Sequence, residues 1–156
     1  MTSGAAMICE GDGTDVAAIM PIMQSAFEPG FGEAWTAAQC LATLSMPGSR
    51  LIFARDGATV LGFALSRWVH DEEELLLIAV DPTARRKGVA GKLIEAMIVN
   101  ARDCGRAVVF LEVRDGNPAF SFYSKAGFTP VGRRNGYYRN QDGSRHDAIT
   151  MSLVLN

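Results

Sequence analysis

The order of strand-like and helix-like segments in this 156-residue sequence predicts an α/β fold, an α+β arrangement in which helices cover a mixed sheet. Apolar periodicity gives the order β-α-α-β-β-β-α-β-α-β-β. The β-α-β unit in the middle of this order should cross over with a right hand. The chain contains no repeat, low-complexity tract or linker, so we expect a single domain over residues 1–156.

Each element is expected where its periodicity lies between turn or capping residues. Proline at Asp81-Pro82 ends one strand, and Gly105 and Gly127 end two helices. The acidic run over residues 71–74 is expected to be a solvated turn. The expected strands are residues 5–9, 50–54, 59–69, 75–80, 108–113, 128–134 and 147–155. The expected helices begin at Thr14 or Asp15, Trp35, Gly88 and Asn117 and run to about residues 27, 46, 103 and 126.

The composition excludes several classes of protein. With 15 Lys+Arg against 17 Asp+Glu, the chain lacks the basic excess of a general nucleic-acid binder. No apolar run approaches the roughly 18 residues of a membrane span, and residues 1–7 lack the features of a secretory signal. We therefore expect a cytoplasmic protein with no nucleic-acid or membrane partner.

Metal and hydrolase chemistry find little support in the chain. The cysteines are odd in number, widely spaced and without a CxxC pair, which indicates reduced thiols and not disulfides or a zinc site. The two histidines lie far from every cysteine, so we expect no metal site. No GxSxG motif is present for a serine hydrolase.

The segment from Val80 to Leu93 places a glycine-rich turn between a strand and a helix. Three cations directly precede the helix, where the macrodipole disfavours each of them by about 0.3–1 kcal/mol. Their presence there predicts an anion held between the cations and the free backbone amides, although an exposed basic loop is the alternative. The turn fits neither GxGxxG nor GxxxxGK[ST]. The expected anion-binding residues are Arg85, Arg86, Lys87, Gly88, Val89, Ala90, Gly91 and Lys92.

Arg85-Arg86-Lys87-Gly88-Val89-Ala90 resembles the acetyl-CoA pyrophosphate loop of the GNAT N-acetyltransferase superfamily, (Q/R)-x-x-G-x-(G/A). From about Leu75 to Met151 the chain is similar to the RimI type, bacterial N-terminal alanine acetyltransferases of a small-subunit ribosomal protein. In the first half only Ala34-Trp35-Thr36 echoes that type. The resemblance implies the acyl-CoA N-acyltransferase fold and acetyl-CoA as cosubstrate. The segments that carry it are Leu111–Arg114, Asn117, Phe122–Phe128, Arg133–Tyr138 and Asp147–Met151.

An N-acetyltransferase must present a neutral amine to a thioester and protonate the departing thiolate. At pH 7 roughly one α-amine in seven is neutral, against about one lysine in 2,500. An α-amine acceptor therefore needs only a mild base. Glu112 is the candidate, because an acid in the apolar run Val108–Val113 is costly to bury unless it is paired or functional.

The resemblance also places the catalytic glutamate of the RimI type at Glu112. The alternative is a structural carboxylate paired with Arg114 or a later arginine. Glu74 is set aside as too near the hairpin turn. Tyr123 is the candidate acid, since the family carries a proton-donating tyrosine there and a phenol is protonated at pH 7. The alternative for Tyr123 is a buried aromatic that packs its helix on the sheet.

The remaining site residues follow from the resemblance. Asn117, an N-cap by its place before Pro118, is also implied to contact CoA. The backbone of Ile78 and Val80 should pair with the pantetheine arm, and Ala79 between them is also expected at the cofactor. A main-chain N–H near Val80 could polarise the thioester carbonyl. Acids such as Glu28, Glu33 or Glu112 could attract a basic peptide. The expected acceptor-binding residues are Glu28, Trp35, Tyr137 and Tyr138, from the loop after the first helix and a loop before the last strand.

Three functions remain open at this point. The first is a RimI-like acetyltransferase of a protein N-terminal α-amine, such as the N-terminal alanine of a ribosomal protein. The second is a GNAT enzyme that acetylates a small amine, such as a polyamine, amino acid or aminoglycoside. The third is a non-catalytic acyl-CoA-binding module in which Glu112 and Tyr123 are structural. Sequence leaves the oligomeric state open.

Overall fold

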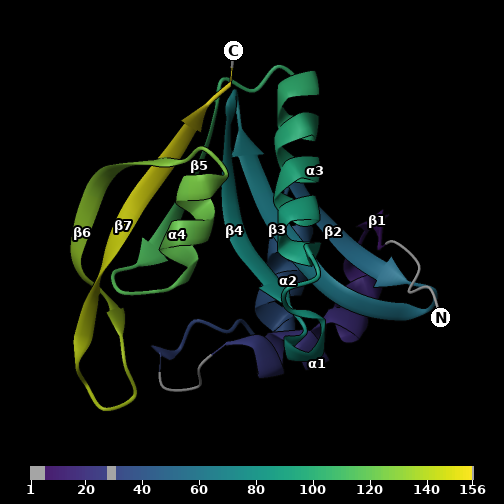
Figure 1. The fold of residues 1–156 in the computed structure, drawn as a ribbon, viewed down its shortest axis with the longest axis horizontal. Helices are drawn as coiled ribbons and strands as arrows, with labels where there is room; N and C mark the ends of the chain where they lie inside the picture. Colours follow the sequence, from purple (N-terminus) through teal and green to yellow (C-terminus); the bar gives the residue numbers. More distant parts are fainter. Residues whose placement is uncertain (1–5, 28–30, 156) are drawn as a thin grey trace.

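The computed structural model describes residues 6–27 and 31–155. Seven strands form one sheet in the order β1-β2-β3-β4-β5-β7-β6, and the predicted sequence of elements is confirmed, with two short 3₁₀ turns added (Figure 1). The elements are β1 (Met7–Gly11), η1 (Gly13–Asp15), α1 (Val16–Ala26), α2 (Ala37–Leu44), β2 (Ser49–Asp56), β3 (Thr59–Val69), β4 (Glu72–Val80), η3 (Pro82–Ala84), α3 (Val89–Asp103), β5 (Val108–Arg114), α4 (Ala119–Lys125), β6 (Thr129–Arg139) and β7 (Arg145–Val154).

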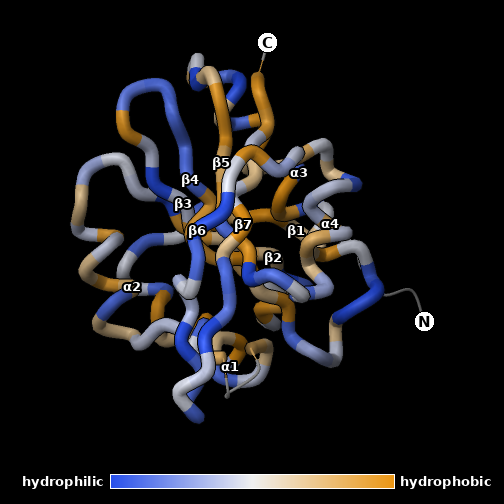
Figure 2. The backbone as a smooth tube through the Cα atoms, turned by 90° about the vertical axis from the view of Figure 1, so that its left-hand side faces the viewer, coloured by the Kyte–Doolittle hydropathy of each residue, from blue (hydrophilic) through white to orange (hydrophobic). Residues whose placement is uncertain are grey.

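Helices cover both faces of the sheet. The side chains of α1 and α2 pack on one face, and those of α3 and α4 pack on the other. Successive strand residues alternate between these layers, as in β2, where Leu51 faces α1 and Ile52 faces α3. Figure 2 shows the apolar stretches gathered in the centre of the molecule, around β5 and β7, and hydrophilic stretches toward its outer turns.

The parallel pair in the middle of the sheet is short. β4 and β5 are in register only from Glu72–Val108 to Leu75–Leu111, whereas the neighbours of these strands are antiparallel. Past Leu75 the two strands separate, which leaves the second half of β4 without a partner on that side (Figure 1).

The free edge of β4 is defined by its register with β3. The Asp81 N–H donates to the Leu61 carbonyl at 2.8 Å, and regular antiparallel pairing continues from there to the Leu65–Leu77 pair, beyond which the register shifts. In such a ladder, successive residues point their backbone N–H and C=O groups alternately toward and away from the neighbouring strand. These groups of Ala79 therefore point toward β3, whereas those of Ile78 and Val80 point away from it. These polar groups therefore face the gap between β4 and β5.

The expected solvated turn over residues 71–74 is present only at Asp71 and is wrong for residues 72–74. β4 already begins at Glu72, and Glu73 is fully buried. The Ser66 hydroxyl donates to the Glu73 carboxylate at 2.9 Å, and the Arg106 Nε lies 3.6 Å from it. Strand alternation carries Glu73, alone among the four acids, into the core, where Ser66 and Arg106 are its partners.

The last hairpin also differs from the prediction. Tyr137, Tyr138 and Arg139 lie in strand β6, not in a loop, and β6 continues five residues beyond the expected end at residue 134. The register between β6 and β7 shifts between Arg134 and Tyr138, and Gly136 has a φ of 64°. This irregularity breaks the alternation by which the strand would be detected in the sequence.

None of the described helices is long and apolar enough to cross a membrane.

Candidate active site

A cleft lies where β4 and β5 diverge. Its volume is about 1070 Å³, and its walls come from the end of α1, the loop before α2, β4 and the turn after it, β5, α4 and β6. Most of the residues that the sequence predicts for a functional site line this cleft. They are Trp35, Ile78, Ala79, Val80, Arg85, Arg86, Ala90, Glu112, Asn117, Tyr123, Tyr137 and Tyr138.

Other predicted residues lie outside the wall, and Glu28 lies outside the described residues. The Val89 side chain packs in the core beneath α3. Gly88 has a φ of 75°, and a Cβ on Gly88 or Gly91 would meet no other described residue within 4 Å beyond its own chain neighbours. Both glycines thus border open space at the start of α3. The residues outside the wall are Lys87, Gly88, Val89, Gly91 and Lys92.

The basic turn before α3 contains two differently engaged arginines. Arg85 donates from Nη2 to the carbonyl of Ala26, the last residue of α1, at 2.9 Å. This contact is favourable because a helix ends in unpaired carbonyls and partial negative charge. Arg86 adopts a left-handed backbone with a φ of 66° and forms no ion pair with a described residue. Of the two arginines in the cleft wall, Arg86 is therefore the one whose guanidinium is more available to bind an anion.

Glu112 projects from β5 to the cleft face of the sheet, since Leu111 and Val113 point into the core under α3. Its carboxylate is 2.9 Å from the Arg134 Nε, and 12% of its side chain is exposed. The expected alternative, a pair with an arginine, is therefore present, with Arg134 as the partner. Glu112 thus forms an ion pair with Arg134 and lines the cleft at the same time.

Tyr123 lies on α4 and is 8% exposed. Its ring is 5.4 Å from that of Phe122 and 6.1 Å from that of Phe128, centroid to centroid. Burial, and to a lesser degree the charge of Glu33, raises the pKa of Tyr123 above that of an ordinary phenol. The hydroxyl is thus held in its protonated form at neutral pH.

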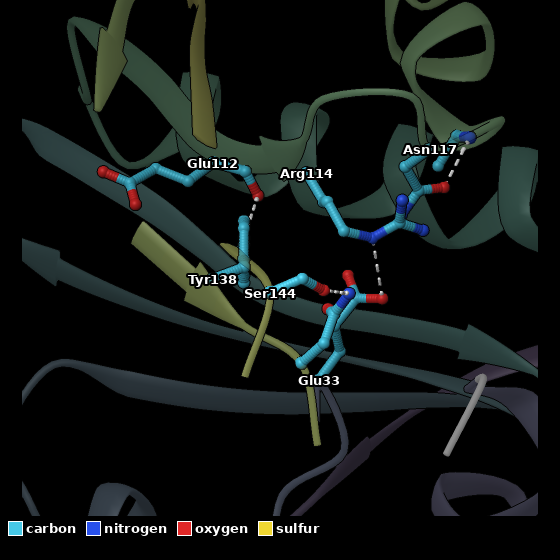
Figure 3. Close-up of polar contacts among 8 residues, drawn as sticks. Glu33, Glu112, Arg114, Asn117, Tyr138 and Ser144 are labelled. Atoms are coloured by element: carbon cyan, nitrogen blue, oxygen red, sulfur yellow. Dashed lines mark hydrogen bonds and ion pairs between the residues drawn. The ribbon is translucent and has the colours of Figure 1, made fainter. Parts of the chain in front are cut away.

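Tyr138 stands across the cleft on β6. Its hydroxyl donates to the Glu112 carbonyl at 3.4 Å (Figure 3), and its ring meets that of Tyr137 edge-on at 5.1 Å. Burial raises the pKa of Tyr138, and the charges of Glu33 and Glu112 add to the effect. The negative charge of Glu33 therefore acts on two protonated phenols, those of Tyr123 and Tyr138.

The predicted capping contact of Asn117 is present, although the N-cap position of α4 is the next residue, Pro118. The Asn117 side-chain oxygen accepts a hydrogen bond from the Ala119 N–H at 2.9 Å, and Asn117 also lines the cleft (Figure 3).

The sequence profile described as "Acetyltransferase (GNAT) family" matches residues 16–128. This chain belongs to the GNAT family. The predicted resemblance and fold class are thereby confirmed.

Three similar proteins refine the place of the chain within the GNAT family. It is 37% identical over 97 residues to the [ribosomal protein bS18]-alanine N-acetyltransferase of Haemophilus ducreyi, covering 62% of this chain and 67% of that protein. It is 36% identical over 122 residues to the N-alpha-acetyltransferase RimI of Mycobacterium tuberculosis, covering 75% and 73%. The crystal structure of the ribosomal-protein-S18-alanine N-acetyltransferase from Escherichia coli superimposes with a TM-score of 0.88 and 30% identity, over 97% of this chain and 95% of that one.

The sequence alignments with the curated bS18-alanine relatives are shorter than the structural one. The matched segment spans 66% of the Haemophilus influenzae protein and 64% of the Escherichia coli protein.

Sequence analysis missed the position of Glu74. This GNAT chain has Glu74 inside β4 and in the cleft wall, not at a turn. Burial raises the pKa of Glu74, and the nearby charge of Glu112 raises it further. The error follows from the acidic run, which hides where β4 begins.

Sequence analysis also missed the pairing of Glu33 with Arg114. The Arg114 Nε lies 3.5 Å from the Glu33 carboxylate, and both residues line the cleft (Figure 3). Arg114 had been considered only as a partner of Glu112. No local signal connects two residues 81 positions apart.

Proposed function

We propose that this chain is an N-acetyltransferase that moves the acetyl group of acetyl-CoA directly to the N-terminal α-amine of a protein. The observation that carries the proposal is the cleft between β4 and β5, where the unpaired backbone groups of Ile78 and Val80 share one space with Glu112 and Tyr123. The names of the similar proteins support an α-amine, and specifically an N-terminal alanine, as acceptor.

The free edge of β4 and the start of α3 can bind two different parts of CoA, the pantetheine arm and the pyrophosphate. Backbone N–H and C=O groups of Ile78 and Val80 can pair with the amides of pantetheine as a strand would. Arg86, Arg85 and the first amides of α3 supply positive charge for a pyrophosphate. The open space at Gly88 and Gly91 lets phosphate approach the backbone.

Glu112 takes the proton from the acceptor ammonium, directly or through a water molecule. The neutral nitrogen then attacks the thioester carbonyl and an N–C bond forms. The nitrogen gives up its second proton to water in the cleft as the C–S bond breaks, so that a neutral amide is left. A main-chain N–H at the free edge near Val80 stabilises the negative oxygen in between. Arg134 holds the Glu112 carboxylate at the wall of the cleft, so the base is oriented before the acceptor arrives.

Tyr123 gives its proton to the departing sulfur. Its raised pKa keeps the hydroxyl protonated until the thiolate forms, and its burial on α4 keeps bulk water from competing. The proton removed from the amine and the proton given to sulfur are thus handled by two residues in two walls of the cleft.

The acceptor side is formed by Trp35, Tyr137 and Tyr138. Three carboxylates, Glu33, Glu74 and Glu112, face the same cleft and favour a positively charged N-terminus.

A thiol-release assay with acetyl-CoA, run across N-terminal peptides and small amines, tests the proposal. We expect a peptide that begins Ala-Arg to be acetylated faster than any polyamine, amino acid or aminoglycoside. A small amine that outpaces every peptide would make the acceptor class wrong. Tight acetyl-CoA binding without turnover on any amine would indicate a non-catalytic binding module.

A further inference from the structure

Arg114 is a charged side chain in a buried position. It is the last residue of β5, and 7% of it is exposed. Its guanidinium lies 3.6 Å above the centre of the Phe31 ring, while its Nε lies 3.5 Å from the Glu33 carboxylate. Because a buried charge is costly without partners, these two contacts account for its place in the fold.

Both partners belong to the loop between α1 and α2. The Phe31 ring also meets His146 of β7 edge-on, with ring centres 5.6 Å apart. The guanidinium thus joins this loop to β5 directly and to β7 through Phe31. We name the three residues Phe31, Glu33 and Arg114 the loop clamp.

Two of the three residues of the loop clamp, Glu33 and Arg114, line the cleft. Gly32, Glu33 and Trp35 of the loop line it together with Arg114. Glu33 lies near enough to both phenols for its charge to raise the pKa of Tyr123 and of Tyr138. A shift of the loop would therefore move a wall of the cleft and a carboxylate that faces the two tyrosines.

We propose that Arg114 is the positioning residue of the acceptor side. It fixes the loop over residues 31–36 against the end of β5, so that acceptor binding depends on it and acetyl-CoA binding does not. The inference rests on the proposed function and adds to it the residue that orders the acceptor wall. Most residues expected to meet acetyl-CoA lie on β4, in the turn after it and at the start of α3, away from the loop clamp. Asn117 is the exception, because its N–H donates to the Arg114 carbonyl at 3.0 Å, but this backbone contact does not involve the Arg114 side chain.

The first test replaces Arg114 by Gln and measures both substrates. We expect the acceptor KM to rise about 10- to 100-fold, as for a wall displaced by about 1 Å, while the Kd of acetyl-CoA stays within about twofold. Arg114→Lys keeps the charge but lacks the planar group that stacks on Phe31, so it should recover only part of the loss. A Kd that rises as much as the acceptor KM would overturn the inference.

Glu33→Gln breaks the same ion pair from its loop side, and it replaces Arg114→Gln in the test if that variant folds poorly. Both variants break the same ion pair between Glu33 and Arg114. The acceptor KM of the double variant should therefore be about as high as that of the worse single variant. Fully additive losses would contradict the loop clamp.

Arg133→Gln is the matched control, because Arg133 also pairs with carboxylates, those of Asp115 and Asp147, but outside the cleft wall. It should leave the acceptor KM unchanged.

A readout without acceptor separates this inference from the proposed function. With Trp68→Phe as background, Trp35 is the single tryptophan and reports on the loop. Quenching of its fluorescence by acrylamide should increase in Arg114→Gln and Glu33→Gln, and stay unchanged in Arg133→Gln. Unchanged quenching in both clamp variants would overturn the loop clamp even if peptides are acetylated. Increased quenching with no acetylated peptide would support the clamp and refute the function.

Discussion

Glu73 and Glu74 are neighbours in β4 with opposite surroundings. Glu73 points into the core under α3, where Ser66 and Arg106 surround it. Glu74 points to the other face, into the cleft beside Glu112. Burial raises the pKa of both carboxyls, so this shift alone does not separate a structural acid from one in a functional cleft. The sheet face separates them, because Glu73 has an ion-pair partner in the core, whereas Glu74 feels the charges of Arg134 and Arg67 without an ion pair to a described residue and borders the cleft.

The largest effect should come from removing the cation in the core. Arg106→Met leaves Glu73 buried without its ion-pair partner and with only the charge of Arg50 beyond ion-pair distance, and we expect a loss of up to about 3–5 kcal/mol in the free energy of unfolding. Urea unfolding at pH 7 measures it. The double variant Glu73→Leu/Arg106→Met should regain most of the loss, since no unpaired charge remains.

The exposed ion pairs of Arg133 provide the control for that experiment. About half of the Arg133 side chain is exposed, so Arg133→Met should cost less than about 1 kcal/mol. An unchanged urea midpoint for Arg106→Met would show that Arg106 does not compensate Glu73.

The next effect concerns the cleft side. Glu112→Gln keeps the shape of the side chain but removes the proton acceptor, and we expect kcat to fall about 100-fold or more. The Kd of acetyl-CoA should change little, because Glu112 is not among the residues expected to bind it. Stopped-flow thiol release and isothermal titration give the two quantities. Full activity in Glu112→Gln would leave only the structural role, the ion pair with Arg134.

A smaller effect is expected at the cofactor end. Arg86→Glu should raise the Kd of acetyl-CoA about tenfold, and the effect should weaken with added salt. Arg86 is preferable to Arg85, whose contact with the Ala26 carbonyl also holds the end of α1. Arg102→Glu, the same charge change at the far end of α3, should leave the Kd unchanged. An equal effect of both variants would indicate net charge and not a phosphate site.

The comparison also explains what sequence could predict. The turn at Arg85-Arg86-Lys87-Gly88 and the acid in the apolar run of β5 are local patterns, and both identify walls of the cleft. The partners of the buried charges are not local. Glu33 meets Arg114 only because β5 ends beside the loop before α2. Glu112 meets Arg134 only because β7 pairs with β5 and β6 in turn pairs with β7.

The acidic run of β4 misleads for a related reason. Consecutive charges are typical of a solvated turn, but in a strand every second one changes face. Only the position of Ser66 and Arg106 makes it possible to bury Glu73. A single sequence does not contain that information until the register of β3 and β4 is known.

The last prediction applies one substitution to both neighbours. Removing the Glu73 carboxylate also removes an ionisation that burial opposes, but Glu73→Gln leaves the largely buried Arg106 without a counter-charge. We expect this second effect to outweigh the first, so Glu73→Gln should lower the Tm. Glu74→Gln should raise the Tm at pH 7 by about 2 °C, because it removes a carboxylate whose ionisation is opposed by burial and by Glu112. A carboxyl whose folded pKa is raised contributes its stability below its unfolded pKa and loses it as the pH rises through its folded pKa.

The gain from Glu74→Gln should therefore disappear near pH 4, where the carboxyl is protonated in both states. Calorimetry at the two pH values measures the difference, and Glu72→Gln, an exposed neighbour, is the control that should not respond. If Glu73→Gln and Glu74→Gln shift the Tm in the same direction, the two faces of β4 do not differ in the way argued above. Opposite signs would establish that the core has a cation for its acid, whereas the cleft keeps Glu74 at a cost in stability, as expected for a site that receives a positively charged acceptor.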